Sequence, residues 1–159
     1  MKIIRGIKDI AKDYDIFILD QWGVMHNGLE GYNHAIDAVD KLIKANKKLI
    51  IISNSSRRKK NSIERLYDFG FDKNHFIEVM TSGEMVWQEL FNSIDKYGIQ
   101  MKKCFHIYDV SKEDGIDFRN GLEKFEFVDN IKQSDFILAC TPFVNSSPLD
   151  YIPMLNDAL

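Results

Sequence analysis

At 159 residues the chain is near the usual size of one domain, and its 45% hydrophobic and 28% charged residues are ordinary for a globular protein. The net charge of −3 gives no electrostatic reason to expect a nucleic-acid partner. No apolar run approaches transmembrane length and the N-terminus lacks the apolar core of a signal peptide, so we expect no membrane partner and a cytoplasmic location. Cys104 and Cys140 lie in separate strand-like runs, which gives neither a zinc signature nor a disulfide framework.

The first predicted element is a strand over residues 16–19 that ends in a carboxylate. Ile-Phe-Ile-Leu is an unbroken apolar run, typical of a strand that is covered on both faces. Asp20 follows directly, and Gly23 comes three residues later. In open α/β sheets the carboxyl ends of parallel strands face the ligand crevice. We therefore expect Asp20 at that crevice; the alternative is an Asp that only starts a turn.

A helix and a second strand come next. Apolar residues at helical spacing, Ile36, Val39 and Ile43, separate the first strand from a second buried run over residues 49–52. Strand, helix and strand in this order form the parallel crossover unit. The second strand ends in four small polar residues, Ser53-Asn54-Ser55-Ser56, so a carboxylate and a hydroxyl-rich loop are expected at one sheet edge. A carboxylate can attack phosphorus, and hydroxyls and backbone N–H groups can hold phosphoryl oxygens.

The rest of the chain continues the α/β pattern. A helix is predicted to stop at Gly70, a residue suited to the left-handed terminal position. Thr81-Ser-Gly-Glu84 resembles a capping box that opens another helix, and Ser147-Pro148 opens the last one. The remaining apolar runs predict strands over residues 76–80, 104–108, 125–128 and 136–140.

Two of these segments resemble motifs of the haloacid dehalogenase-like hydrolases. Asp20-Gln-Trp22-Gly23-Val24 resembles the first motif, Asp-x-Asp-Gly-(Thr/Val), and Ile51-Ile52-Ser53-Asn54 resembles the second. The spacing and the glycines after the first motif are similar to the capped NagD-like or nitrophenylphosphatase-like branch (class IIA). Within that branch a subgroup carries Asp-x-Trp-Gly-Val. Both motifs occur in order with a helix between them.

The resemblance implies a partial Rossmann-like parallel α/β core over residues 1–80 and an inserted α/β cap over residues 81–159. It implies a Mg²⁺-dependent hydrolase of a small phosphorylated substrate, such as a sugar phosphate or a nucleotide, acting through an aspartyl-phosphate on Asp20. Mg²⁺ would bind the Asp20 carboxylate and the backbone carbonyl of Trp22. The residues implied to contact the phosphate or substrate are Trp22, Gly23, Ser53, Asn54 and Arg57.

Two departures from the family pattern affect this interpretation. Trp22 replaces the second Asp of the first motif, and an indole cannot act as a general acid or base near neutrality. Motifs three and four would lie beyond Leu159, so we expect a fragment that is inactive alone, or a homo-oligomer that covers the exposed strand edge. The alternative function is a non-catalytic phosphate-binding module that keeps the fold.

Two side chains near these motifs have competing interpretations. His26 is expected to be a turn residue satisfied by backbone groups, and the alternative is a substitute acid or base for the missing Asp. Trp87 is expected to pack within its helix rather than to stack on a substrate. Four scattered histidines give no i, i+4 pair for a metal.

Overall fold

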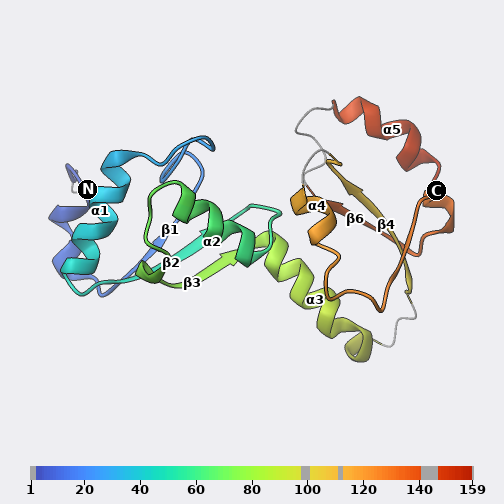
Figure 1. The fold of residues 1–159 in the computed structure, drawn as a ribbon, viewed down its shortest axis with the longest axis horizontal. Coiled ribbons are helices and arrows are strands. Elements are labelled where there is room, and N and C mark those ends of the chain that lie inside the picture. Colours follow the sequence, from blue (N-terminus) through green and yellow to red (C-terminus); the bar gives the residue numbers. More distant parts are fainter. Residues whose placement is uncertain (1–2, 98–100, 111–112, 141–146, 159) are drawn as a thin grey trace. The chain divides into compact units, whose positions relative to one another are not determined.

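A computed structural model describes residues 3–97, 101–110, 113–140 and 147–158 (Figure 1). The chain divides into two compact units, which are described separately. The first unit comprises Met1–Ser55 and Lys59–Ser82, and the second comprises Ser56–Arg58 and Gly83–Leu159. Residues 56–58 group with the later part of the chain, and the other boundary between the units lies at Ser82 and Gly83. The assignment of residues 1–80 to a hydrolase core and of residues 81–159 to a cap stays a prediction.

The first unit is built on a three-stranded parallel sheet in the order β1-β2-β3. Two helices make the connections, as expected for parallel crossovers. Short 3-10 turns at Ile7–Asp9, Ala11–Asp13 and Lys73–His75 complete the unit. The strands and helices are β1 (Ile16–Leu19), α1 (Asn33–Lys44), β2 (Lys48–Ser53), α2 (Lys59–Asp68) and β3 (Phe76–Thr81).

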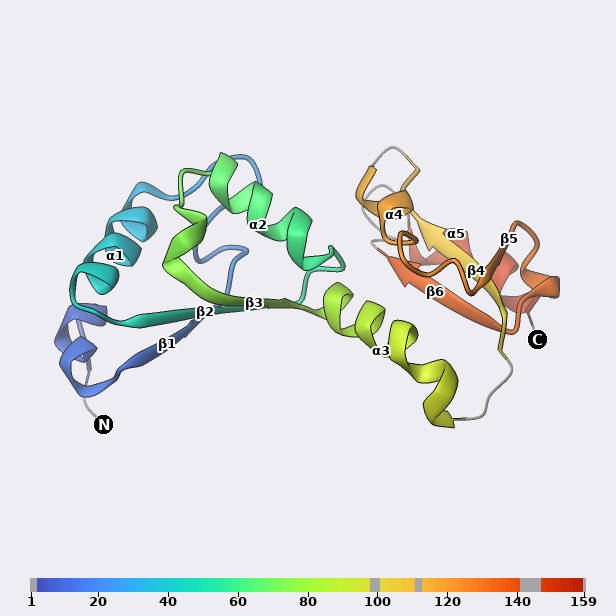
Figure 2. The same cartoon turned by 60° about the horizontal axis from the view of Figure 1, so that its bottom comes forward.

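Both helices of this unit cover the same face of the sheet (Figure 2). Val39 and Leu42 of α1 and Leu66 of α2 pack on Leu49 and Ile51 of β2. Full burial of each such side chain contributes roughly 1.5–3 kcal/mol. The apolar residues that predicted these helices therefore also determine which face of each helix packs on the sheet.

The opposite face of this sheet is not covered by the described residues of the unit. Ile18 is 63% exposed and Ile52 is 52% exposed, and Ile16, two residues before Ile18 on β1, is also exposed. The expectation that residues 16–19 form a strand covered on both faces is therefore wrong for the described part of the chain. The apolar run indicates that both faces can be buried, but it does not indicate which segment covers each face.

Helix α2 ends as its sequence predicts. Gly70 has a φ of 89°, and the Phe71 N–H donates to the Leu66 carbonyl. This is the left-handed termination for which glycine is favoured, because a Cβ is strained at that φ. Phe71 is then placed in the core beside Leu66.

The second unit contains another parallel sheet, in the order β5-β4-β6. Cys104, Leu138 and Cys140 lie on its covered face, packed with Phe118 and Leu122. The last helix begins at Pro148 after Ser147, as predicted; Ser147 caps it, and Asp150 completes a capping box that was not predicted. The elements are α3 (Ser82–Tyr97), β4 (Lys103–Tyr108), α4 (Glu113–Asp117), β5 (Glu126–Val128), a 3-10 turn (Ile131–Gln133), β6 (Phe136–Cys140) and α5 (Pro148–Asn156).

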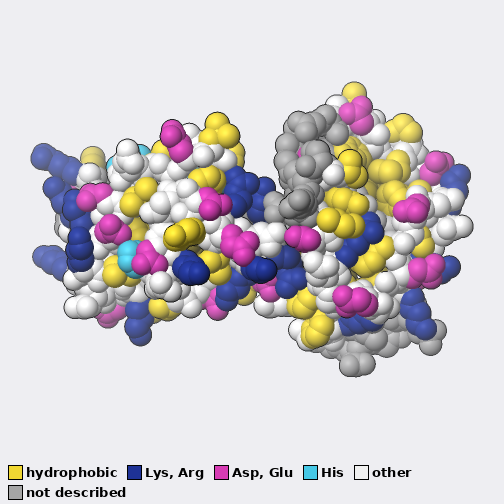
Figure 3. Space-filling view, viewed as in Figure 1, with side chains coloured by type: hydrophobic (Ala, Val, Ile, Leu, Met, Phe, Trp, Pro, Cys, Tyr) yellow, Lys and Arg dark blue, Asp and Glu magenta, His cyan; other side chains and the backbone are white. Residues whose placement is uncertain are grey.

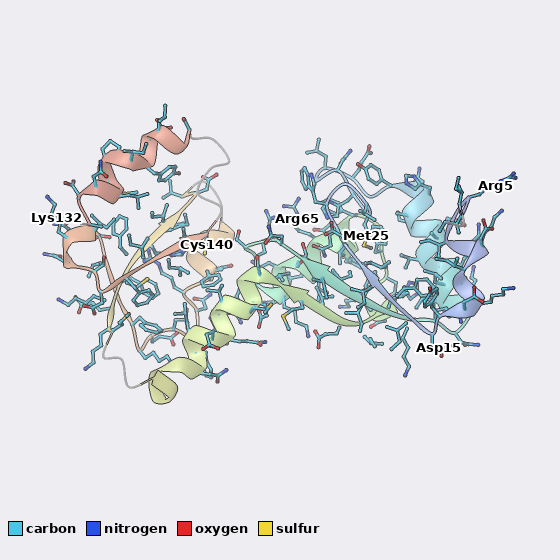
Figure 4. All side chains as sticks on the ribbon, turned by 180° about the vertical axis from the view of Figure 1, so that it is seen from behind. Arg5, Asp15, Met25, Arg65, Lys132 and Cys140 are labelled. Atoms are coloured by element: carbon cyan, nitrogen blue, oxygen red, sulfur yellow. The ribbon has the colours of Figure 1, made fainter. Side chains whose placement is uncertain are left out.

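The two cysteines of this unit behave as apolar side chains. Burial raises the pKa of the Cys104 thiol to about 11 and that of Cys140 to about 11. Both thiols therefore stay protonated at neutral pH, and a protonated buried thiol is a poor nucleophile and metal ligand. Figure 4 shows Cys140 within this unit.

His106 is a buried histidine of the second unit. Its Nδ1 accepts a hydrogen bond from Arg119 Nε at 3.1 Å, and its ring stacks on Tyr108 with a centroid separation of 4.6 Å. Burial, with the nearby Arg119 charge, lowers the pKa of His106 to about 4. The imidazole is therefore neutral at pH 7 and is held by its aromatic neighbours and Arg119.

All six strands predicted from the sequence are present, with ends that differ by at most one residue. Among the described residues, no helix is both long enough and apolar enough to span a membrane. Figure 3 shows Lys and Arg side chains interspersed with Asp and Glu over one face of each unit, so neither of these faces carries a single sign of charge.

Candidate active site

The carboxyl ends of the three strands of the first unit lie at one sheet edge. Leu19 of β1 pairs with Ile51 of β2, and Ser53 of β2 pairs with Thr81 of β3. Asp20 and Ser53 therefore follow the Leu19–Ile51 pair by one and two positions on adjacent strands. This is the edge at which ligands bind in open parallel sheets.

Asp20 is an exposed carboxylate at this edge. Its Oδ1 accepts a hydrogen bond from the backbone N–H of Gln21 at 2.8 Å. Among the described residues, Oδ2 has no hydrogen-bond partner. One oxygen thus orients the carboxylate while the other stays accessible for attack or for metal binding.

The turn after Asp20 is closed by backbone hydrogen bonds. The Gln21 carbonyl accepts the N–H groups of Val24 and Met25, the second at 2.8 Å. Gly23 adopts a φ of 74° and donates its N–H to the His26 carbonyl at 2.8 Å. A side chain at that φ would be strained, which explains why the turn needs glycine at this position.

Gln21 fixes the turn to helix α2, a role that the sequence did not indicate. The residue is 4% exposed, and its Oε1 accepts a hydrogen bond from Ser62 Oγ at 3.1 Å. Its Nε2 is buried without a partner among the described residues. The two residues are 41 positions apart, so no local pattern could have paired them.

Trp22 lies over Gly28, with its ring held by the turn. The side chain is 67% exposed, and a Cβ at Gly28 would overlap with the indole ring. Gly28 is itself fixed, because Arg65 Nη2 donates to its carbonyl at 2.8 Å and its N–H donates to His26 Nδ1 at 3.1 Å. Figure 4 labels Arg65 on α2 and Met25 in this turn. The indole is therefore held against Gly28, with most of its surface facing solvent.

His26 is a turn residue and not a free acid or base. It is 8% exposed, its Nδ1 accepts the Gly28 N–H, and its ring packs on Phe69 at a centroid separation of 4.7 Å. The backbone-satisfied interpretation is confirmed. Trp87 likewise packs in the core of the second unit, and its Nε1 donates to the Asn120 carbonyl at 3.0 Å.

The hydroxyl-rich loop after β2 is held by side-chain hydrogen bonds from within the loop and from Ser82 of α3. Ser53 Oγ accepts the Ser55 N–H at 3.3 Å, and Ser82 Oγ donates to the Ser55 carbonyl at 2.9 Å. Ser53 is half-buried and Asn54 is exposed. Of the expected site residues, the structure gathers five at this edge of the first unit: Asp20, Trp22, Gly23, Ser53 and Asn54.

Arg57 belongs to the second unit and is not assigned to this edge. The Ser56–Arg58 segment is fixed within that unit by Arg58, whose Nε donates to Glu84 Oε2 at 2.7 Å. The Arg58 guanidinium also lies 3.7 Å from the centre of the Trp87 ring. A Cβ at Gly83 would overlap with the Ser56 carbonyl, so the absence of a side chain there permits this close approach.

The donors available for a metal at the first unit's edge are oxygen atoms. Among the described residues, no three His, Cys, Asp or Glu side chains form a cluster, and no donor bonds to the Trp22 carbonyl. The Asp20 carboxylate and that carbonyl are hard ligands, and Mg²⁺ is commonly held by one or two carboxylates with waters and substrate phosphates. The donor set therefore fits Mg²⁺.

Comparison with known proteins gives one family match and several similar structures. The model of the family described as haloacid dehalogenase-like hydrolase matches residues 17–113. No curated protein matches the chain. A haloacid dehalogenase-like hydrolase from Brucella suis is 23% identical, with a TM-score of 0.78 over 98% of this chain and 56% of that one.

Two phosphatase-related structures share the fold at lower identity. The 4-nitrophenylphosphatase from Thermotoga maritima is 16% identical, with a TM-score of 0.57 over 94% of this chain and 51% of that one. NagD from E. coli K-12 is 14% identical, with a TM-score of 0.55 over 91% of this chain and 50% of that one. This chain thus spans about half the length of each of these structures.

Proposed function

Since the chain belongs to the haloacid dehalogenase-like hydrolase family, we propose that the complete protein containing it is a Mg²⁺-dependent phosphatase of the NagD-like branch, acting on a small phosphorylated metabolite. The observation that carries the proposal is the exposed Asp20 carboxylate at the strand edge, next to the Ser53–Asn54 loop. The likeness in fold to a nitrophenylphosphatase and to NagD supports it.

In the proposed reaction Asp20 Oδ2 attacks the phosphorus atom, and the bond from phosphorus to the leaving oxygen breaks. The Gln21 N–H holds Oδ1, so the attacking oxygen is already oriented. Water then attacks the phosphorus of the aspartyl-phosphate, the Asp20–phosphorus bond breaks, and the carboxylate is regenerated with release of inorganic phosphate.

Neighbouring groups would hold the phosphoryl oxygens during this transfer. The Ser53 hydroxyl and the Asn54 amide can donate hydrogen bonds to them, as can backbone N–H groups of the loops. The Asp20 carboxylate and the Trp22 carbonyl would hold Mg²⁺, which when bound would offset the negative charge of the phosphoryl group. The positions of Mg²⁺ and Arg57 in the complete protein are part of this proposal.

A second candidate function is a phosphate-binding module without turnover. The observation that favours it is Trp22, which supplies no titratable proton where the family resemblance implies an Asp. The first candidate predicts turnover that depends on Asp20, and the second predicts phosphate binding without turnover.

The decisive variant is Asp20→Asn in the complete protein, assayed with para-nitrophenyl phosphate and Mg²⁺. The amide is nearly isosteric but is a very poor nucleophile, so turnover should disappear while the circular dichroism spectrum is unchanged. Asp15→Asn is the matched control, because Asp15 is an exposed carboxylate just before the amino end of the same strand. Equal activity of the two variants would refute Asp20 as the nucleophile, and a wild-type protein that binds phosphate without turnover would favour the module.

A further inference from the structure

Within the described part of the first unit, the side chains that adjoin Asp20 in the turn and in the Ser53–Ser56 loop offer no proton for a leaving group. The five residues after it, 21–25, carry no titratable side chain, and neither does the loop over residues 53–56. His26 is buried, and its Nδ1 is occupied by the Gly28 N–H. Among residues 21–32 the only carboxylate is Glu30. Its backbone N–H and that of Leu29 donate to the Asn27 side chain.

With no acid in the turn or in the Ser53–Ser56 loop, the leaving oxygen departs as an anion. When phosphorus is transferred to Asp20, the electron pair of the breaking bond stays on that oxygen. An alkoxide is a very poor leaving group, because the pKa of a simple hydroxyl group, like that of water, lies far above neutrality. A carboxylate, a phosphate or an acidic phenolate is a stable anion and leaves without being protonated.

The exposed apolar residues of the turn indicate what the leaving group can contact. Trp22 packs against Gly28 and is exposed to solvent, and Val24 and Leu29 are also exposed. A fixed indole face provides stacking and apolar contact for a flat group. This surface suits an aromatic or apolar leaving group better than a small, strongly hydrated one.

Resting on the proposed function, we infer that the substrate is an activated phosphoryl compound whose leaving group departs as an anion: an aryl phosphate, an acyl phosphate or a phosphoanhydride. Alkyl phosphates, including phosphate esters of sugar hydroxyls, are poor substrates. In the first step Asp20 Oδ2 bonds to phosphorus and the leaving oxygen takes the electron pair. In the second step water bonds to phosphorus, its proton passes to solvent or the departing phosphate, and Asp20 recovers its carboxylate.

The test compares kcat/KM for para-nitrophenyl phosphate and phenyl phosphate in the complete protein with Mg²⁺. Both leaving groups are aromatic, but phenol has a pKa of about 10, as tyrosine does, whereas para-nitrophenol is much more acidic. The expected ratio in the wild type is about 10²-fold or more, the size of a missing general-acid contribution. Trp22→Asp should reduce this ratio at least about tenfold by raising kcat/KM for phenyl phosphate.

Glu30→Gln serves as the matched control for a hidden acid. It should leave the ratio unchanged, and a selective loss of phenyl phosphate turnover in this variant would overturn the inference. A wild-type ratio near one would also overturn it, whether or not Trp22→Asp folds. Absence of Asp20-dependent turnover on every phosphate would instead overturn the proposed function, which keeps the two failures distinct.

Discussion

The ion pair between Arg58 and Glu84 should contribute strongly to the stability of the second unit. The Arg58 side chain is 21% exposed and that of Glu84 is 10% exposed, with Nε and Oε2 2.7 Å apart. Glu84→Gln keeps the shape but removes the charge that faces the guanidinium. A buried hydrogen bond to a charged group is worth about 1.5–3 kcal/mol, so we expect a loss of about 2 kcal/mol in the free energy of unfolding.

Trp87 provides a local probe for this measurement. In a Trp22→Phe background it is the one remaining tryptophan of the chain, and the Arg58 guanidinium lies over its ring. Urea unfolding followed by Trp87 fluorescence therefore reports the second unit. The control is Asp157→Asn, which removes a carboxylate from an exposed ion pair with Lys132 in the same unit. Exposed pairs contribute about 0.2–1 kcal/mol.

Comparable losses in Glu84→Gln and Asp157→Asn would refute the reasoning. Such a result would mean that the Arg58 guanidinium is solvated or is held by Trp87 alone. The Ser56–Arg58 segment would then not depend on its ion pair for its place in the second unit.

Two further predictions concern the second unit's histidine and the first unit's turn. Burial and Arg119 lower the pKa of His106 to about 4 in the folded state, whereas it is about 6.5 in the unfolded state. The contribution of neutral His106 to the free energy of unfolding is therefore fully present above pH 6.5. That contribution is lost as the pH falls towards 4; Trp87-detected unfolding at pH 5 should show a loss of about 2 kcal/mol that His106→Phe abolishes. Gly28→Ala should displace the Trp22 ring as well as strain the backbone, whereas Gly23→Ala, with a φ of 74° and open space, should only strain it. A larger change in Trp22 fluorescence for Gly28→Ala is expected, and equal changes would refute the seating of the indole.

The sequence predicted the elements well because their signals are local. Gly70 ends α2 through its positive φ, and Ser147 caps α5, as the residue types indicate. The position of Asp20 at the end of β1 could be predicted because the apolar run before it stops abruptly. These features depend on a few neighbouring residues, so a pattern in the chain is enough to find them.

The supports of the site were not predictable, because they join distant residues. Gln21 bonds to Ser62, and Arg65 bonds to the Gly28 carbonyl, across 41 and 37 positions. Neither α2 residue differs in kind from an ordinary polar helix residue. The pairing depends on how α2 packs on the sheet, which the sequence pattern alone does not determine.

The central claim, that Asp20 is the nucleophile, is tested most directly by locating the transferred phosphoryl group. The complete protein is incubated with para-nitrophenyl phosphate and Mg²⁺, quenched with acid during turnover, and mapped by peptide mass spectrometry. We expect phosphorylation at Asp20, absent from Asp20→Asn. A phosphoryl group on Ser53, or turnover with no phosphorylated Asp20 at any quench time, would contradict the account.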